Sequence, residues 1–210
     1  MAVSDKIGSI LLYLVRHANV AEDKAGVIRG TLNPSIDAKG EKQRDELVDY
    51  FKDIPLSGIV TDDLARTQET VLPIAEQKNL ELQIDIDLRS WDVGADLENK
   101  SIEVHKQEII RLKTQPWLVP VGGQSWGEYE GQALEGFYRY VHRGMDSAFP
   151  WLAGVHGSLV QVVAMELKLM EKKYTYDATP IEPSGIIAVY LTRTGLKLRI
   201  LRGDKGGSDE

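Results

Sequence analysis

Two histidines and two arginines stand out because of the residues that precede them. Arg16 and His17 follow an apolar run, His156 follows a second such run, and Arg66 lies a few residues beyond a third. Guanidinium groups pair bidentately with phosphate oxygens, and a neutral imidazole can attack phosphorus to form a covalent intermediate. A second imidazole can donate a hydrogen bond to the charge that develops. These residue types are suited to binding and transferring a phosphoryl group.

The apolar runs that precede these side chains are predicted to be buried strands. Residues 11–15 are too few to cross a bilayer, and their unbroken apolar character is typical of a parallel strand covered on both faces. Segments 56–61 and 150–157 are predicted to be strands as well. Ligands of open α/β sheets bind at the carboxyl ends of strands, so three neighbouring strands would bring the polar residues together. Taken alone, Arg16 and His17 could equally be the solvated start of a loop.

The rest of the chain alternates between helical and strand patterns. Helices are expected at residues 38–53 and about 101–113. Another is expected to begin after Asp62 or Asp63, either of which can cap it, and one more after His156. A Ser-x-x-Glu capping box at 125 predicts a helix that runs to about 145. Further strands are expected at 82–86, 186–192 and 196–201, the last two as a hairpin. The alternation predicts an α/β fold, a single-domain three-layer sandwich with a mostly parallel central sheet flanked by helices.

The remaining segments lack such periodicity. Residues 1–9 are expected to form a loose lead-in, and 18–37 a long loop of the kind that often carries function. The domain is predicted to span 1–202, with an insertion at about 91–130. Residues 203–210 are polar and Gly-rich, which is typical of a disordered tail.

Composition limits the classes of partner and compartment. The net charge is −7 and no long basic run occurs, so nucleic acid and anionic membranes are disfavoured as partners. The chain has no cysteine, which excludes disulfides and thiolate sites and fits a cytoplasmic protein. A signal peptide at residues 1–21 is disfavoured because Asp5 lies in its basic end and no small-x-small cleavage site follows its apolar core.

Several segments, in order along the chain, resemble the histidine phosphatase (phosphoglycerate mutase-like) superfamily. The family's Arg-His-Gly signature is matched by Arg16-His17-Ala18, and its second His-Gly by His156-Gly157. Between these two matches, residues 29–40 resemble the family's glycine-bearing loop. Residues 60–70 resemble the family's strand that is followed by an arginine. Leu-Arg-Ser-Trp-Asp-Val-Gly at 88–94 and Gly-Gly-Gln-Ser at 122–125 resemble two further family segments.

The resemblance implies a role for each matching residue. His17 is implied to be the nucleophile that becomes phosphorylated, while Arg16, Arg66 and His156 hold the phosphoryl oxygens. Water attack on the phosphohistidine would then release phosphate, with no metal or cofactor. Phosphate or substrate contacts are expected from Gly30, Asn33 and Gly157; Arg29 is equally open to contacting substrate or to anchoring its loop. The implied partner is a small phosphorylated substrate or inorganic phosphate, and the sequence leaves the oligomeric state open.

One departure from the family pattern affects catalysis. Ser90 occupies the position at which many relatives carry the glutamate that protonates the leaving group. Loss of a general acid removes roughly two to four decades of rate. Asp92 is the nearest replacement and is assigned here as the catalytic acid, with Asp96 and Glu98 as further candidates. A second departure is Asp23, which stands where many relatives have a phosphate-contacting asparagine.

These residues predict a metal-independent phosphomonoester hydrolase that acts through a phosphohistidine on His17. Two alternatives remain. One is a phosphoglycerate-type mutase that returns the phosphoryl group to its substrate. The other is a phosphate-binding or regulatory protein without efficient turnover, which Ser90 favours and the intact arginines and histidines disfavour.

Overall fold

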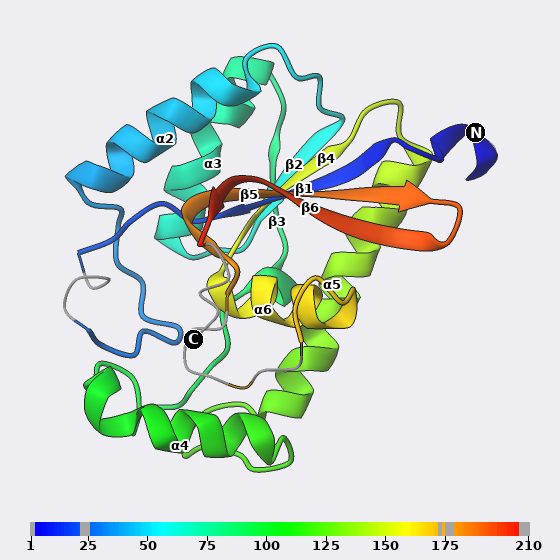
Figure 1. Cartoon of the computed structure of the whole chain (residues 1–210). Coiled ribbons are helices and arrows are strands. Elements are labelled where there is room, and N and C mark those ends of the chain that lie inside the picture. Colours follow the sequence, from blue (N-terminus) through cyan, green and yellow to red (C-terminus); the bar gives the residue numbers. More distant parts are fainter. Residues whose placement is uncertain (1–2, 22–25, 172–173, 175–178, 206–210) are drawn as a thin grey trace.

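The computed structural model describes residues 3–21, 26–171, 174 and 179–205. Its centre is a six-stranded sheet with the strand order β3-β2-β4-β1-β5-β6 (Figure 1). Strands β1 (Ile10–Arg16), β2 (Gly58–Thr61), β3 (Leu82–Ile84) and β4 (Trp151–Val155) run parallel, and the hairpin of β5 (Ile181–Thr192) and β6 (Gly195–Asp204) is antiparallel to β1. The prediction of a mostly parallel sheet with β2, β4 and β1 as neighbours is therefore confirmed.

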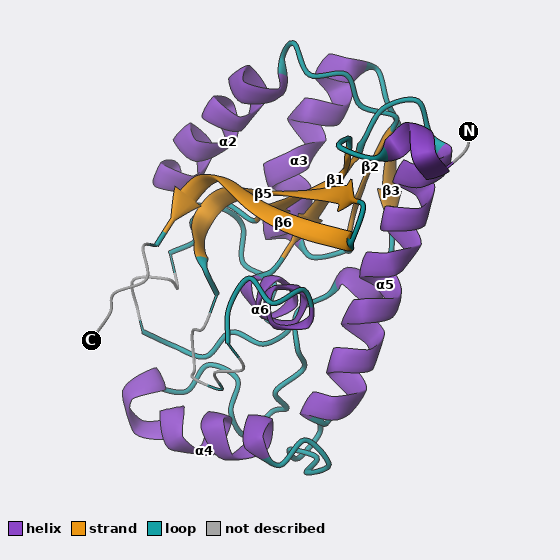
Figure 2. Cartoon of the chain, turned by 45° about the vertical axis from the view of Figure 1, so that its right-hand side comes forward, coloured by secondary structure: helices purple, strands orange, loops and turns teal. Residues whose placement is uncertain are grey.

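Helices cover both faces of the sheet (Figure 2). One face packs on α2 (Ala38–Phe51) and α3 (Ala65–Lys78), and the other on α5 (Trp126–Asp146) and α6 (Gly157–Glu166). The predicted three-layer sandwich is confirmed. A further helix, α4 (Ile102–Thr114), lies beyond α6 and away from the sheet (Figures 1 and 2).

The local sequence explains why the central elements form where they do. Residues 11–16 of β1 are all buried because α6 packs on one side of the strand and the α2/α3 layer packs on the other, which matches its uninterrupted apolar run. The predicted capping box starts α5: Ser125 Oγ accepts from the Glu128 backbone, and the Glu128 carboxylate accepts from the Ser125 backbone. The predicted buried strand at β1 and the predicted start of α5 are therefore both confirmed.

Several boundaries differ from the predictions. Val3–Lys6 forms a short 3-10 helix, η1, rather than a loose lead-in, and its Lys6 ammonium donates to the Ser147 carbonyl. Strand β6 continues to Asp204, so the tail predicted from 203 begins in the sheet; residues 206–210 lie outside the described part of the chain. Pairing with β5 holds these polar and glycine residues in place, because backbone hydrogen bonds need no apolar side chains. A second short 3-10 helix, η2 (Ile86–Leu88), follows β3.

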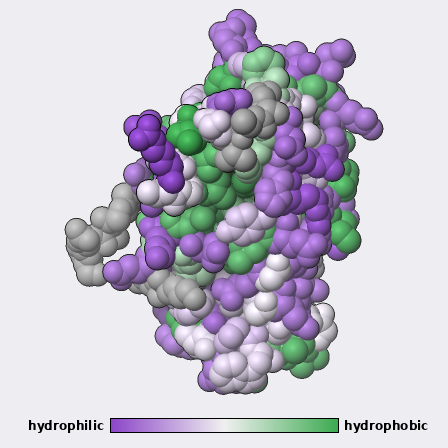
Figure 3. All heavy atoms as spheres, turned by 90° about the vertical axis from the view of Figure 1, so that its right-hand side faces the viewer, coloured by the Kyte–Doolittle hydropathy of each residue, from purple (hydrophilic) through white to green (hydrophobic). Residues whose placement is uncertain are grey.

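The surface is mixed in character. The face in Figure 3 carries mostly hydrophilic residues, with hydrophobic ones between them. The large apolar side chains that are exposed include Trp117, Val119 and Val121, which follow α4. Within the described ranges, no helix combines the length and the apolar character needed to cross a membrane.

Candidate active site

The register of the sheet brings the two histidines together. Arg16 of β1 pairs with Val155 of β4, so the residues that follow, His17 and His156, leave the sheet side by side. The backbone N–H of His17 donates to the Val155 carbonyl at 2.9 Å, and the two imidazole centroids are 5.4 Å apart. Both side chains are buried, with 2% of their surface exposed.

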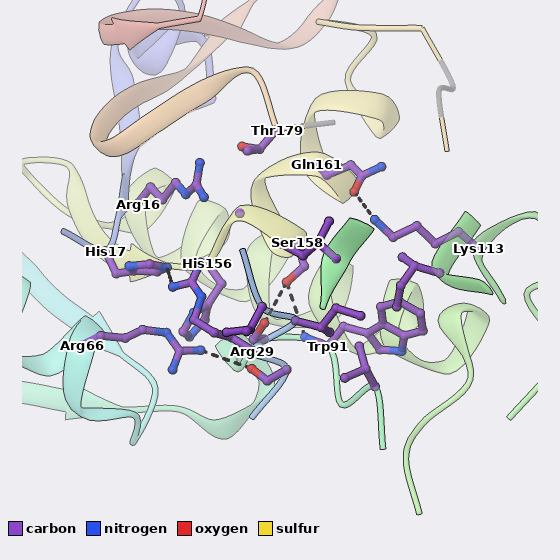
Figure 4. Close-up of a pocket in the computed structure, with 18 residues that line it drawn as sticks. Arg16, His17, Arg29, Arg66, Trp91, Lys113, His156, Ser158, Gln161 and Thr179 are labelled. Atoms are coloured by element: carbon purple, nitrogen blue, oxygen red, sulfur yellow. Dashed lines mark hydrogen bonds between the residues drawn. The ribbon is translucent and has the colours of Figure 1, made fainter. Parts of the chain in front are cut away.

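A cavity of about 190 Å³ opens at this edge of the sheet (Figure 4). Both histidines line it, together with the cationic side chains of Arg16, Arg29, Arg66 and Lys113. Among the described residues that line the cavity, none is an aspartate or a glutamate. The first turn of α6, Gly157 and Ser158, also faces the cavity, and a helix N-terminus favours an anion. The site is therefore built for a small anionic group.

Hydrogen bonds set the tautomer of His17. Its Nδ1 lies 2.7 Å from the Ala18 carbonyl oxygen, which can only accept, so Nδ1 carries the proton. Burial lowers the pKa of His17 well below 6.5, and the charges of Arg29 and Arg66 lower it further. The ring is thus neutral, with the lone pair on Nε2, to which Arg29 Nη1 donates at 3.2 Å. A neutral Nε2 facing a cationic cavity is the arrangement that a phosphoryl-accepting nucleophile requires.

His156 is held by an aspartate. Its Nε2 lies 2.5 Å from Asp62 Oδ2, and Asp62 is completely buried just beyond the end of β2. Burial lowers the pKa of His156 to about 4, against the opposing effect of the Asp62 charge. Burial would raise the pKa of Asp62, but its bonds to His156 and Thr67 keep that pKa below its usual value. His156 therefore donates from Nε2 to a carboxylate, which leaves Nδ1 as its second polar atom.

The arginines also order the walls of the cavity. Arg66 donates through Nη1 to the Leu32 carbonyl and through Nη2 to the Gly30 carbonyl at 3.3 Å, which ties the loop at 26–37 to α3. Arg16 Nη1 donates to the Ile181 carbonyl at 2.8 Å. A Cβ at Gly157 would lie 3.3 Å from Arg16 Cζ, so glycine there allows the guanidinium to lie against the start of α6.

Two residues assigned to the site from sequence lie elsewhere. Asn33 does not line the cavity; its Oδ1 accepts from the backbone N–H of Ala65 at 2.6 Å, at the start of α3. Asp92 does not line the cavity either; its Oδ1 accepts from the Gly94 N–H at 2.9 Å. Arg29, Gly30 and Gly157 do line it.

The other two candidate acids do not line the cavity and cannot reach a leaving group there in this conformation. Asp96 is exposed, and neither Asp96 nor Glu98 lines the cavity. The Glu98 carboxylate accepts from the N–H and the hydroxyl of Thr31, which anchors the loop at 26–37. Asp23 lies outside the described residues.

Five polar residues at or beside the site were missed by sequence reasoning: Asp62, Lys113, Ser158, Gln161 and Thr179. The sequence pattern predicts Asp62 or Asp63 to be a helix cap, whereas Leu64 is the N-cap of α3 and Asp62 accepts the backbone N–H of Leu64. Its position directly after a strand, like that of His17, could have indicated it. Lys113 lies at the end of an amphipathic helix, where no local signal separates it from surface residues. Gln161 lies in α6, which is apolar on nearly all sides and buried, so its polar side chain could have marked it.

We expect Asp62→Ala to lower the free energy of unfolding by about 3 kcal/mol, because it leaves the buried His156 Nε2–H without its acceptor. The matched control is Asp63→Ala, whose partner Arg89 lies in an ion pair with side chains 42% and 38% exposed. That control should cost less than about 1 kcal/mol. Urea unfolding of both variants measures the difference. Equal losses would contradict the buried pair.

The two buried histidines predict acid sensitivity. Between about pH 6.5 and 4 the unfolded chain binds protons that folded His156 and His17 do not, so the free energy of unfolding falls as pH falls. The slope is up to about 1.4 kcal/mol per pH unit for each histidine. The lowered pKa of Asp62 adds a further loss below about pH 4. Denaturant titrations across this range should show the slope reduced in His156→Gln and unchanged in His142→Gln, a change at an exposed position on α5. A flat profile in the wild type would refute the prediction.

Comparisons with known proteins agree with this geometry. The model of the histidine phosphatase superfamily (branch 1) matches residues 12–201. Phosphoserine phosphatase 1 of Hydrogenobacter thermophilus is 31% identical over 140 residues, which cover 64% of this chain and 65% of that protein. A Yersinia enterocolitica protein named as a phosphoglycerate mutase, GpmB, is 28% identical over 71% of this chain and 67% of its own length.

Solved structures share the fold at low identity. A phosphoglycerate mutase from Bacillus anthracis superposes with a TM-score of 0.75 at 15% identity, covering 92% of this chain and 93% of that one. A mycobacterial glucosyl-3-phosphoglycerate phosphatase gives a TM-score of 0.71 at 15% identity, covering 92% and 97%. The family match spans nearly the whole chain, both histidines and Arg66 included. The chain therefore belongs to branch 1 of the histidine phosphatase superfamily.

Proposed function

We propose that this chain hydrolyses phosphomonoesters through a phosphohistidine on His17. The observation that carries the proposal is the state of His17: Nδ1 carries the proton and donates to the Ala18 carbonyl, and the unprotonated Nε2 faces a cavity with cationic walls. Phosphatase names among the relatives support hydrolysis, and the size of the cavity suits a small substrate.

In the first step the Nε2 lone pair attacks phosphorus, the P–N bond forms, and the ester P–O bond breaks as the leaving alkoxide takes up a proton from water. Arg16 and Arg66 bind the non-bridging oxygens. His156 binds a third oxygen in its doubly protonated form, in which Nδ1 donates to the oxygen while Nε2 remains bonded to Asp62. Arg29 moves its donated hydrogen bond from Nε2 to a phosphoryl oxygen, which releases the lone pair. A water molecule then attacks phosphorus and breaks the P–N bond, yielding inorganic phosphate and the neutral histidine.

A mutase is a second candidate, because relatives of comparable similarity carry that name. The two reactions share the phosphohistidine and differ in the acceptor. In the hydrolase, water accepts the phosphoryl group; in the mutase, a second hydroxyl of the substrate does.

The test is to trap the intermediate. The protein is mixed with a ³²P-labelled aryl phosphate in the presence of EDTA and quenched in alkali, in which phosphohistidine survives. We expect an acid-labile label on the peptide that contains His17, followed by release of inorganic phosphate. Label without phosphate release, but with transfer to an added hydroxy acid, would favour the mutase. Absence of label together with tight vanadate binding would favour a phosphate-binding protein.

A further inference from the structure

Three hydroxyl groups form a chain that ends in the wall of the cavity. Tyr129 OH, on α5, donates to Ser158 Oγ at 2.8 Å, and Ser158 Oγ lies 3.3 Å from Ser90 Oγ. Ser90 and Ser158 both line the cavity, whereas Tyr129 is completely buried. In Figure 4 Ser158 lies beyond His156 as seen from His17. The chain therefore runs from the protein core to the space that a substrate would occupy.

The numbers of donors and acceptors fix the direction of this chain. Ser158 Oγ accepts from Tyr129 and, at 3.4 Å, from the backbone N–H of Trp91, which uses both lone pairs of the hydroxyl. The proton of Ser158 is then directed to Ser90 Oγ, which accepts it. Tyr129 is the donor at the buried end, because a phenol that accepted there would leave its own proton without a partner. Burial raises the pKa of Tyr129 above its usual value, so the phenol keeps its proton.

This direction leaves the hydroxyl proton of Ser90 free to be donated. In the described part of the chain Ser158 is the one hydrogen-bond partner of Ser90 Oγ, and the remaining side of this hydroxyl lines the cavity. The segment around Ser90 is held in place, because the Trp91 indole N–H donates to the Gln124 carbonyl at 2.8 Å. Ser90 therefore offers a positioned, uncharged donor to a molecule in the cavity.

The proposed hydrolysis needs a positioned water molecule at this wall. The leaving alkoxide takes its proton from water, since no carboxylate among the described residues lines the cavity. An in-line displacement sends the leaving oxygen away from Nε2 of His17, toward the side on which Ser158 lies (Figure 4). The hydroxide that remains after the proton transfer is stabilised only if a donor faces it.

We propose that Ser90, oriented by Ser158 and Tyr129, holds one water molecule that serves both steps of the hydrolysis. In the first step an O–H bond of this water breaks and its proton goes to the leaving alkoxide, which forms an alcohol and a hydroxide. In the second step the hydroxide oxygen bonds to phosphorus, the P–N bond breaks, and the electron pair returns to Nε2 of His17. Ser90 keeps its proton throughout and stabilises the hydroxide by donation. The inference rests on the proposed phosphohistidine mechanism and assigns its water site.

Single-turnover kinetics separate the two steps. Ser90→Ala should slow phosphoenzyme formation from an alkyl phosphate by roughly ten- to a hundredfold, the effect of losing a hydrogen bond to a charged group. Formation from 4-nitrophenyl phosphate should hardly change, because nitrophenolate leaves without a proton. Decay of the ³²P-labelled phosphohistidine should slow by roughly ten- to a hundredfold with either substrate, because it needs the same hydroxide. Ser90→Thr keeps the hydroxyl and should restore most of both rates.

Tyr129→Phe tests the direction of the chain. Without the phenol, Ser158 no longer has to donate to Ser90, so the two rates that Ser90→Ala lowers should fall by roughly two- to tenfold. Combining the variant with Ser90→Ala should cost nothing further, because both changes remove the same donor. The matched control is Tyr138→Phe on the same helix, whose phenol bonds Glu166 and does not line the cavity; its rates should equal those of the wild type.

A merely structural serine would affect the stability of the fold but not the ratio of the rates on the two substrates. Equal losses on alkyl and aryl phosphates, or unchanged decay of the phosphohistidine, would overturn the inference and leave the hydrolase proposal intact. Fully additive losses in the double variant would overturn it as well, because the hydroxyls would then act independently. Absence of label on His17 in the wild type would instead remove the hydrolase proposal, and the water site with it.

Discussion

Replacing His17 by alanine is expected to lower the rate of aryl phosphate hydrolysis by at least roughly four decades and to abolish the phosphoenzyme. The variant keeps the arginines but has no atom at which a P–N bond can form, and loss of a nucleophile removes nearly all covalent catalysis. Stopped-time assays with 4-nitrophenyl phosphate, with and without EDTA, measure the effect. The matched control is His142→Ala, an exposed histidine on α5, which should retain the wild-type rate.

Folding must be separated from chemistry in this comparison. The His17→Ala variant should unfold cooperatively and still bind inorganic phosphate, because Arg16 and Arg66 have their own backbone partners. A variant that folds, binds phosphate and still turns over at a rate near that of the wild type would refute the phosphohistidine mechanism. Inactivity of both proteins towards an aryl phosphate would instead favour the phosphate-binding alternative, because such a leaving group hardly needs an acid.

Ser90→Glu is expected to raise the hydrolysis of alkyl phosphates by roughly two to four decades, the contribution of a general acid. Ser90 lines the cavity with its hydroxyl 3.3 Å from that of Ser158, and no carboxylate among the described residues lines the same space. A glutamate introduced there would face the leaving group and supply the proton that an alkoxide needs. For aryl phosphates, whose leaving oxygen is already stable as an anion, the gain should be much smaller.

The control for this prediction is Asp92→Asn. The amide keeps an oxygen for the Gly94 N–H and removes only the acid, so it should change the rate on alkyl phosphates by less than about threefold if Asp92 is structural. A loss of two decades or more would make Asp92 the proton donor after all, with a conformation different from the one described here. No gain in Ser90→Glu would indicate that another group already protonates the leaving oxygen.

Sequence reasoning identified the residues that share one property, a position at the carboxyl end of a buried strand or directly after it. Arg16, His17 and His156 could be grouped in this way because apolar runs mark the strands and parallel strands end at one edge. Arg66 followed from its place at the start of the next helix. In the structure β1 and β4 are neighbours and Arg16 pairs with Val155, so the residues at the ends of these strands lie together as predicted.

The residues that sequence reasoning misplaced depend on loops and distant helices. Asn33 and Asp92 have the chemistry of site residues, yet each side chain satisfies a nearby backbone N–H instead. Asp62 has the pattern of a helix cap but bonds His156 across the boundary between β2 and β4. Short polar side chains often bond to nearby backbone, and only the loop conformation decides between that bond and a ligand.

The amino-acid sequence by itself determined the α/β sandwich, the buried strands and the pairing of two histidines with two arginines, because periodicity and strand ends are local properties. The tertiary structure alone decided which nitrogen of His17 carries the proton and which carboxylate accepts a hydrogen bond from His156. It also decided that Lys113 on α4 lines the same cavity as His17. Those facts depend on contacts between residues that lie tens of positions or more apart, or on a hydrogen bond whose direction only the folded backbone sets. The packing of α4 against the rest of the fold therefore decides which of its side chains line the cavity that contains His17.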